Sequence, residues 1–193
     1  MRRSIILWAA GLLLALLFGL SAALVFIYSG IYNVAATKQH TAPVYWAIHT
    51  AMIHSVRRRA DEVPPMPPPT LLFEQGSRLY QSHCVQCHGG PGVAPEPFAM
   101  GMTPVPLSLV QTAREWAVSE IYWAVKHGIK MTGMPAWEFR FNPTELWSVV
   151  AFVTCLPALS PKDYQAIMID DVTPAVGGIP LSSYCAEHSN HGG

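Results

Sequence analysis

The feature that most limits how this chain can fold is a long uncharged run near its N-terminus. IILWAAGLLLALLFGLSAALVFIY covers Ile5 to Tyr28, 24 residues without a charged side chain. A helix rises about 1.5 Å per residue, so this run spans a hydrocarbon core of roughly 30 Å with some tilt. Trp8 and Tyr28 lie near its two ends, where aromatic rings favour the membrane interface. We therefore expect residues 1–32 to form a single transmembrane anchor in a lipid bilayer.

A cleaved signal peptide is the alternative interpretation of this run. The apolar core of a signal peptide is typically about 7–15 residues, shorter than the run seen here. Ser21 to Ala23 is only a weak cleavage site, because the apolar residues continue past it. We therefore expect an uncleaved anchor. Arg2 and Arg3 favour a cytoplasmic N-terminus, whereas the basic cluster Arg57 to Arg59 lies well beyond the span, where the positive-inside rule counts less.

Charge divides the chain into a basic N-terminal third and an acidic remainder. Residues 1–60 contain six arginine or lysine side chains and no acid. Residues 61–193 contain six basic and twelve acidic side chains, a net charge of −6. Nucleic acid is an unfavourable partner for so acidic a segment. We therefore expect no nucleic-acid binding.

Residues 33–61 are expected to form a basic amphipathic helix next to the membrane. Thr41 and Pro43 are typical of a helix start, and apolar residues follow at three- and four-residue intervals. This helix lies either on the bilayer, with its arginines at lipid phosphates, or against a partner subunit. The proline-rich stretch 62–69 then favours an extended spacer and marks a domain boundary.

The rest of the chain predicts a small all-α domain over residues 70–165, followed by a C-terminal tail over residues 166–193. Three helices are expected, over residues 71–83, 120–127 and 145–156. Three residues precede or begin them in the positions of N-caps: Thr70, Ser119 and Asn142. Gly and Pro are frequent between residues 89 and 111 and predict a loop there. No alternating pattern is long enough to predict a sheet.

The heptapeptide CVQCHGG, residues 84–90, carries the chemistry of this domain. A zinc knuckle needs four ligands, commonly two CxxC pairs, and the two other cysteines form no second pair. A thioredoxin-like site needs a βαβ pattern beside its CxxC, and the sequence shows none. The third interpretation is a c-type haem attachment site. Cys84 and Cys87 then form thioethers and His88 binds the iron.

A second iron ligand is expected in HGIKMTGMPAW, residues 127–137. Met134 follows His88 by 46 residues, and it lies in a loop bounded by Gly and Pro, from which a thioether can reach the other face of a haem. With these pieces the sequence resembles the class I cytochromes c, in particular bacterial membrane-anchored monohaem ones. The resemblance extends from residue 70 to about residue 157. It rests on the segments SHCVQCHGGPG, PVPLSL, EIYWAVKHGIKMTGMPAW and ELWSVVAFVTCLP.

The resemblance implies a class I cytochrome c domain wrapped around one covalent haem c. It implies His88 and Met134 as the axial ligands of the haem iron, with Met131 as the rival of Met134. It also implies that Gly76 and Tyr80 of the first helix pack against the last helix, near Trp147 and Val150.

Weaker expectations concern the surroundings of the haem. The resemblance suggests that three side chains bond the haem propionates, although core or surface packing explains each equally well: Arg114, Trp116 and Trp137. Surface or capping roles are expected for four histidines: His83, His127, His188 and His191.

Haem attachment of this type takes place outside the cytoplasm. The resemblance therefore places the haem domain in the periplasm, on a single-pass protein of the bacterial inner membrane with its N-terminus in the cytoplasm. That compartment permits disulfides. We expect Cys155 and Cys185 to pair and to pin the segment between them across the domain.

Two axial ligands leave the iron no open position for a substrate, so we expect one-electron transfer rather than enzymatic catalysis. The expected partners are membrane-bound or periplasmic redox proteins. A dehydrogenase or quinol-oxidising complex would donate electrons, and a terminal oxidase or soluble cytochrome c would accept them, with the chain as a subunit of a larger membrane complex. Two alternatives remain open. One is a haem-based ligand sensor in which CO or NO displaces Met134, and the other is a mainly structural haem subunit.

Overall fold

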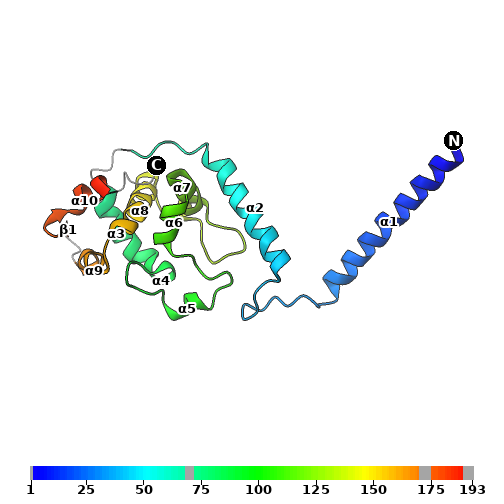
Figure 1. Cartoon of the computed structure of the whole chain (residues 1–193), viewed down its shortest axis with the longest axis horizontal. Helices are drawn as coiled ribbons and strands as arrows, with labels where there is room; N and C mark the ends of the chain where they lie inside the picture. The colour runs from blue at the N-terminus through cyan, green and yellow to red at the C-terminus, as the bar shows by residue number, and fades with distance from the viewer. Residues whose placement is uncertain (1, 68–71, 170–174, 189–193) are drawn as a thin grey trace. The chain divides into compact units, whose positions relative to one another are not determined.

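A computed structural model describes residues 2–67, 72–169 and 175–188 of the chain. Contacts divide the chain into two compact units, Met1–Lys38 and Gln39–Gly193. The described α-helices are α1 (Arg2–Tyr28), α2 (Ala42–Ala60), α3 (Leu72–His83), α4 (Val85–His88), α5 (Pro97–Met100), α6 (Leu109–Glu115), α7 (Val118–His127), α8 (Pro143–Cys155), α9 (Pro161–Ile169) and α10 (Leu181–His188). Two 3₁₀ turns, η1 (Trp137–Phe139) and η2 (Leu156–Ala158), and two short strands, β1 (Ala175–Val176) and β2 (Ile179–Pro180), complete the order (Figure 1).

The first unit contains α1, the helix expected from the uncharged run. Within the described residues, α1 is the one helix long and apolar enough to cross a membrane. All of its described side chains are exposed. An apolar helix exposed in this way is compatible with a membrane anchor.

The second unit is organised around the contact between α3 and α8, the most extensive between any two of its elements. A β-carbon at Gly76 would overlap the carbonyl oxygen of Ser148 and lie 2.9 Å from Cβ of Phe152. Glycine therefore lets the two backbones approach this closely. One turn later, the buried ring of Tyr80 meets that of Phe152 with 5.3 Å between centroids. The predicted packing of Gly76 and Tyr80 on the last helix is confirmed, with Ser148 and Phe152 as the nearest neighbours.

Helix α8 begins where the sequence predicted. The side-chain oxygen of Asn142 accepts hydrogen bonds from the backbone N–H groups of Thr144 and Glu145, at 2.9 and 3.0 Å. The carboxylate of Glu145 accepts in return from the backbone N–H of Asn142 at 2.8 Å. This capping box satisfies N–H groups that have no partner inside the helix. All residues from Leu146 to Val153 are buried, so α8 is the central element of the core.

Elsewhere the helix boundaries differ from the prediction. Helix α7 begins at Val118, so Ser119 lies inside it and does not cap it. The reason is that the backbone N–H of Ala117 donates to the carboxylate of Glu120 at 2.9 Å, so the helix begins earlier in the chain than expected. The expected loop over residues 89–111 contains α5 and the first turn of α6. The expected cap at Thr70 lies outside the described residues.

Helix α2 belongs to the second unit and packs against α7. Thr41 holds the N-cap position, without a hydrogen bond from its side chain. Near the other end, Val56 and Ala60 are buried, and Nε of Arg57 donates to Glu120 at 3.2 Å. The basic helix was expected on the bilayer or on a partner subunit. In the structure its C-terminal half contacts α7 of its own chain, and the expected contact with a bilayer or a partner subunit stays a prediction.

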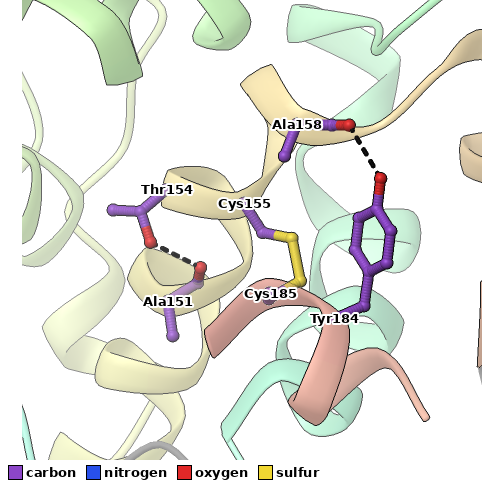
Figure 2. Close-up of a disulfide and its surroundings, with 6 residues drawn as sticks. All are labelled: Ala151, Thr154, Cys155, Ala158, Tyr184 and Cys185. Atoms are coloured by element: carbon purple, nitrogen blue, oxygen red, sulfur yellow. Dashed lines mark hydrogen bonds between the residues drawn. A yellow bond between two sulfur atoms is a disulfide. The ribbon is translucent and has the colours of Figure 1, made fainter. Parts of the chain in front are cut away.

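The C-terminal segment is fastened to the end of α8. Strands β1 and β2, which the sequence did not predict, pair antiparallel with Ala175 opposite Pro180. Helix α10 then brings Cys185 to Cys155, and Figure 2 shows the disulfide between them, with 5.3 Å between the two Cα atoms. Both cysteines are fully buried. Beside them, the hydroxyl of Tyr184 donates to the carbonyl of Ala158 at 3.1 Å (Figure 2).

The disulfide should stabilise this domain substantially. It closes a sequence separation of 30 residues, for which restriction of the unfolded chain contributes about 3–4 kcal/mol. We expect the double variant Cys155→Ala/Cys185→Ala to lose about that much free energy of unfolding, measured by denaturant titration of the haem-loaded protein. The wild-type protein unfolded in the presence of a reductant is the matched control and should reach the same value. Equal midpoints for the oxidised wild type and the double variant would contradict the pairing.

Candidate functional site

Cys84, Cys87 and His88 lie on one continuous turn that extends α3. The backbone N–H of Cys84 donates to the carbonyl of Tyr80 at 2.8 Å, so the chain enters the motif without a break. The N–H groups of Cys87 and His88 both donate to the carbonyl of Cys84, at 3.1 and 3.0 Å. Residues three apart on such a turn are neighbours on one face. Both cysteines are free thiols, Cys84 buried and Cys87 half-buried.

The imidazole of His88 is oriented by a backbone carbonyl. Its Nδ1 lies 2.8 Å from the carbonyl oxygen of Leu107, in the segment that follows α5. A carbonyl only accepts, so Nδ1 carries the proton and Nε2 is left with a lone pair, the arrangement of metal-binding histidines. Burial lowers the pKa of His88, and the bond to Leu107 acts in the opposite direction. The neutral ring that a metal requires is therefore favoured.

The environment of Cys84 does not resemble that of a redox-active thiol. Burial, and secondarily the proximity of Cys87, raises the pKa of the Cys84 thiol to about 12. Reactive cysteines need a thiolate and have a lowered pKa. Cys84 is therefore a neutral thiol in this structure, which argues against a thioredoxin-like function for the CxxC pair.

Two tyrosines enclose the glycines after His88. The hydroxyl of Tyr80 donates to the carbonyl of Gly89 at 2.8 Å. A side chain at Gly90 would overlap the ring of Tyr164, which reaches this turn from α9. The Tyr164 hydroxyl is buried and has no hydrogen-bond partner among the described residues. Burial and the neighbouring Cys84 raise its pKa to about 12. Sequence reasoning did not identify Tyr164, because it lies outside every recognised motif.

Met134 is held in a tight loop after α7. Gly128 has φ of 65°, and a β-carbon there would lie 2.7 Å from the carbonyl oxygen of Met134. The N–H of Met134 donates to the hydroxyl of Thr132 at 3.1 Å, and that hydroxyl donates to the carbonyl of Ile129 at 2.7 Å. The side chain of Met134 is partly buried against the core. The rival, Met131, is 89% exposed, which favours Met134 as the iron ligand.

An aromatic contact joins the cysteine turn, residues 84–88, to the methionine loop, residues 128–136. The ring of His83 meets Trp137 edge-on at 5.2 Å and Phe141 edge-on at 5.2 Å. Trp137 and Phe141 stack on each other at 4.8 Å. His83 directly precedes Cys84, and Trp137 follows Met134 by three residues. These three rings therefore bring the two halves of the site together. His83 is exposed, as the sequence analysis expected, and its ring nevertheless contacts these two aromatic rings.

The remaining predicted residues differ in exposure and in contacts. Trp116 is half-buried against the core, as Trp137 is, while Arg114 is exposed near the end of α6. Their predicted contacts with haem propionates stay predictions. His127 ends α7 and pairs with Glu138 at 3.3 Å, which closes the base of the methionine loop. The side chain of His188 and the whole of His191 lie outside the described residues.

The donor set fits a covalently attached haem. It consists of two free thiols on one turn, an imidazole whose Nδ1 is already engaged, and a partly buried thioether, all in one compact unit. Thiols provide thioether links, and imidazole with thioether is an established pair of haem iron ligands.

Comparison with protein families matches residues 72–153 to the family described as cytochrome c oxidase, cbb3-type, subunit III. The matched region runs from the start of α3 almost to the end of α8, and it includes both Cys84–His88 and Met134. No curated protein and no solved structure matches the chain.

Denaturing mass spectrometry can distinguish the cysteines expected to attach haem from the cysteines of the disulfide. We expect the double variant Cys84→Ser/Cys87→Ser, matured in a bacterial periplasm, to lose the haem mass that the wild-type chain retains after denaturation. The reason is that only these two thiols are free to form thioethers. The double variant Cys155→Ala/Cys185→Ala is the control and should keep the haem mass. Retention of the haem by the first variant in denaturing mass spectrometry would contradict the assignment.

Proposed function

We propose, from the premise that residues 72–153 form a c-type cytochrome domain, that this protein is a membrane-anchored monohaem cytochrome c that carries single electrons in the periplasm. The observation that carries the proposal is the pair of side chains prepared as iron ligands. His88 has its Nδ1 engaged by Leu107, and Met134 is fixed in a hydrogen-bonded loop.

Four residues of the chain would hold the cofactor. Cys84 and Cys87 would attach it covalently, and His88 through Nε2 and Met134 through Sδ would bind its iron. Haem supplies one-electron exchange between ferrous and ferric iron when it is bound. With His88 and Met134 both bound to the iron, no position would remain for a substrate, and ligation by histidine and methionine would favour a high potential.

The wider setting supports a role in a respiratory membrane. Helix α1 is long and apolar enough to anchor the chain, so the electrons it carries would stay at the membrane. The matched family is described as a subunit of an oxidase. These observations support a donor such as a dehydrogenase or quinol-oxidising complex, and an acceptor such as a terminal oxidase or soluble cytochrome c, within a larger complex. The location that we propose is the inner membrane with a cytoplasmic N-terminus, and its support is the apolar helix α1 preceded by Arg2 and Arg3.

Ligation by Met134 can be tested by spectroscopy. We expect Met134→Ala to abolish the weak far-red band of the iron–methionine bond in the oxidised protein and to lower the reduction potential. Met131→Ala, at the exposed methionine three residues earlier, should leave both unchanged. The measurements are an absorption spectrum and a potentiometric titration of the full chain in detergent. Loss of the band in the Met131 variant instead would show that the rival is the ligand.

Electron flow distinguishes a carrier from a sensor. In membranes of the native host, a carrier should become reduced when a respiratory donor such as a quinol is added. It should stay reduced when the terminal oxidase is blocked by cyanide, and become oxidised again in oxygen when the block is absent. A haem signal that does not follow the donor, together with rapid CO binding by the isolated protein, would favour the ligand sensor instead.

A further inference from the structure

The segment from Met102 to Leu107, which we call the strap, contacts both parts of the candidate haem site. It connects α5 to α6, two short helices of the second unit. One of its ends touches the turn that carries His88, and the other touches the loop that carries Met134. In the sequence, this segment falls within the predicted loop over residues 89–111 and overlaps the PVPLSL element, residues 104–109.

The strap's C-terminal end is fixed to the histidine side. The carbonyl oxygen of Leu107 accepts the hydrogen bond from Nδ1 of His88 at 2.8 Å. Its backbone runs directly into α6, where the N–H of Thr112 donates to the carbonyl of Ser108 at 3.0 Å. This contact uses a main-chain atom, so it does not depend on which side chain occupies position 107.

The strap's N-terminal end lies against the methionine side. A β-carbon at Gly133 would lie 2.5 Å from Cε and 3.2 Å from Sδ of Met102. The thioether end of Met102 therefore fills the space beside Gly133, the residue immediately before Met134. The backbone of Met102 is itself anchored, because its N–H donates to the carbonyl of the fully buried Ala99 at 3.1 Å.

Met102 differs in this respect from its neighbour in sequence, Met100. The side chain of Met100 is 59% exposed, whereas Met102 is half-buried. Both residues belong to the same short stretch and have the same chemistry. Only Met102 is placed against the loop that carries Met134.

We propose that Met102 is a positioning residue for the iron ligand Met134. Its unbranched thioether packs against Gly133 and holds the methionine loop, as a flexible side chain fills an irregular gap. This proposal rests on the function proposed above, in which Met134 binds the haem iron. Removal of the Met102 side chain leaves a gap beside Gly133 that the loop fills only in part. The loop then spends a larger fraction of time with Met134 away from the iron.

The effect of shortening Met102 should be confined to Met134 and should leave His88 unchanged. The carbonyl of Leu107 remains in place when Met102 is shortened, so His88 keeps its orientation. An added ligand such as imidazole competes for the iron only in molecules whose Met134 is displaced. Its apparent affinity therefore rises in proportion to that displaced fraction.

The test uses the full haem-loaded chain in detergent and imidazole as the competing ligand. We expect Met102→Ala to bind imidazole about tenfold more tightly than the wild type, because the displaced fraction sets the apparent affinity, and to show a weaker far-red band. Met100→Ala is the matched control and should behave as the wild type. Met102→Leu, which nearly conserves the volume, should stay close to the wild type. Equal imidazole affinity in Met102→Ala and Met100→Ala would overturn the proposal.

Hydrogen exchange measures the loop itself, whatever ligand the iron has. In Met102→Ala, the amides of residues 128–134 and of Ala136 should exchange roughly tenfold faster, because local opening of the loop becomes more frequent. The amides of α8 serve as an internal reference and should be unchanged, which also shows that the variant is folded. Unchanged exchange in the loop would overturn the role of Met102. A wild-type spectrum without an iron–methionine bond would instead overturn the proposed function, and the exchange measurement would still decide whether Met102 holds the loop.

Discussion

The close contact of α3 with α8 at Gly76 determines the positions of the site residues. Because the backbone of α3 lies against the carbonyl of Ser148, the axis of α3 is fixed relative to the central helix. The cysteine turn continues α3 without interruption, so its position relative to α8 is fixed as well. The opposite end of α8 is fixed by the disulfide to Cys185. Helix α8, buried from Leu146 to Val153, thus supports both the turn that carries Cys84 and the C-terminal segment.

The methionine loop reaches the same place by a different route. It leaves α7 at Gly128, returns at Trp137, and is closed at its base by the pair of His127 with Glu138. The contact of Trp137 with His83 then connects it to the residue before Cys84. The two iron-ligand candidates are 46 residues apart in the sequence, and three aromatic rings together with the strap bring their supporting elements together.

Local signals were sufficient for much of this structure. The uncharged run predicted α1, the capping box at Asn142 predicted the start of α8, and the family match supports a cytochrome c domain. Several contacts that depend on distant partners could not be predicted. Any carbonyl can accept from His88, so nothing in the sequence singled out Leu107. The apolar face of α2 predicts that another element covers it, but not that this element is α7. Ser119 is not the N-cap of α7, because the carboxylate of Glu120 accepts a hydrogen bond from the backbone N–H of residue 117.

The two faces of the candidate site are therefore supported by different kinds of atoms. The support of His88 comes from a main-chain carbonyl, which no substitution of Leu107 removes as long as the strap keeps its path. Met134 is supported by side chains and by the glycines at positions 128 and 133. At both glycines, neighbouring atoms occupy the space that a β-carbon would need. Sequence changes can consequently alter the methionine side while the histidine side stays constant. In the proposed function a methionine ligand contributes to a high potential, and this asymmetry would then let the fold adjust the potential without disturbing covalent attachment.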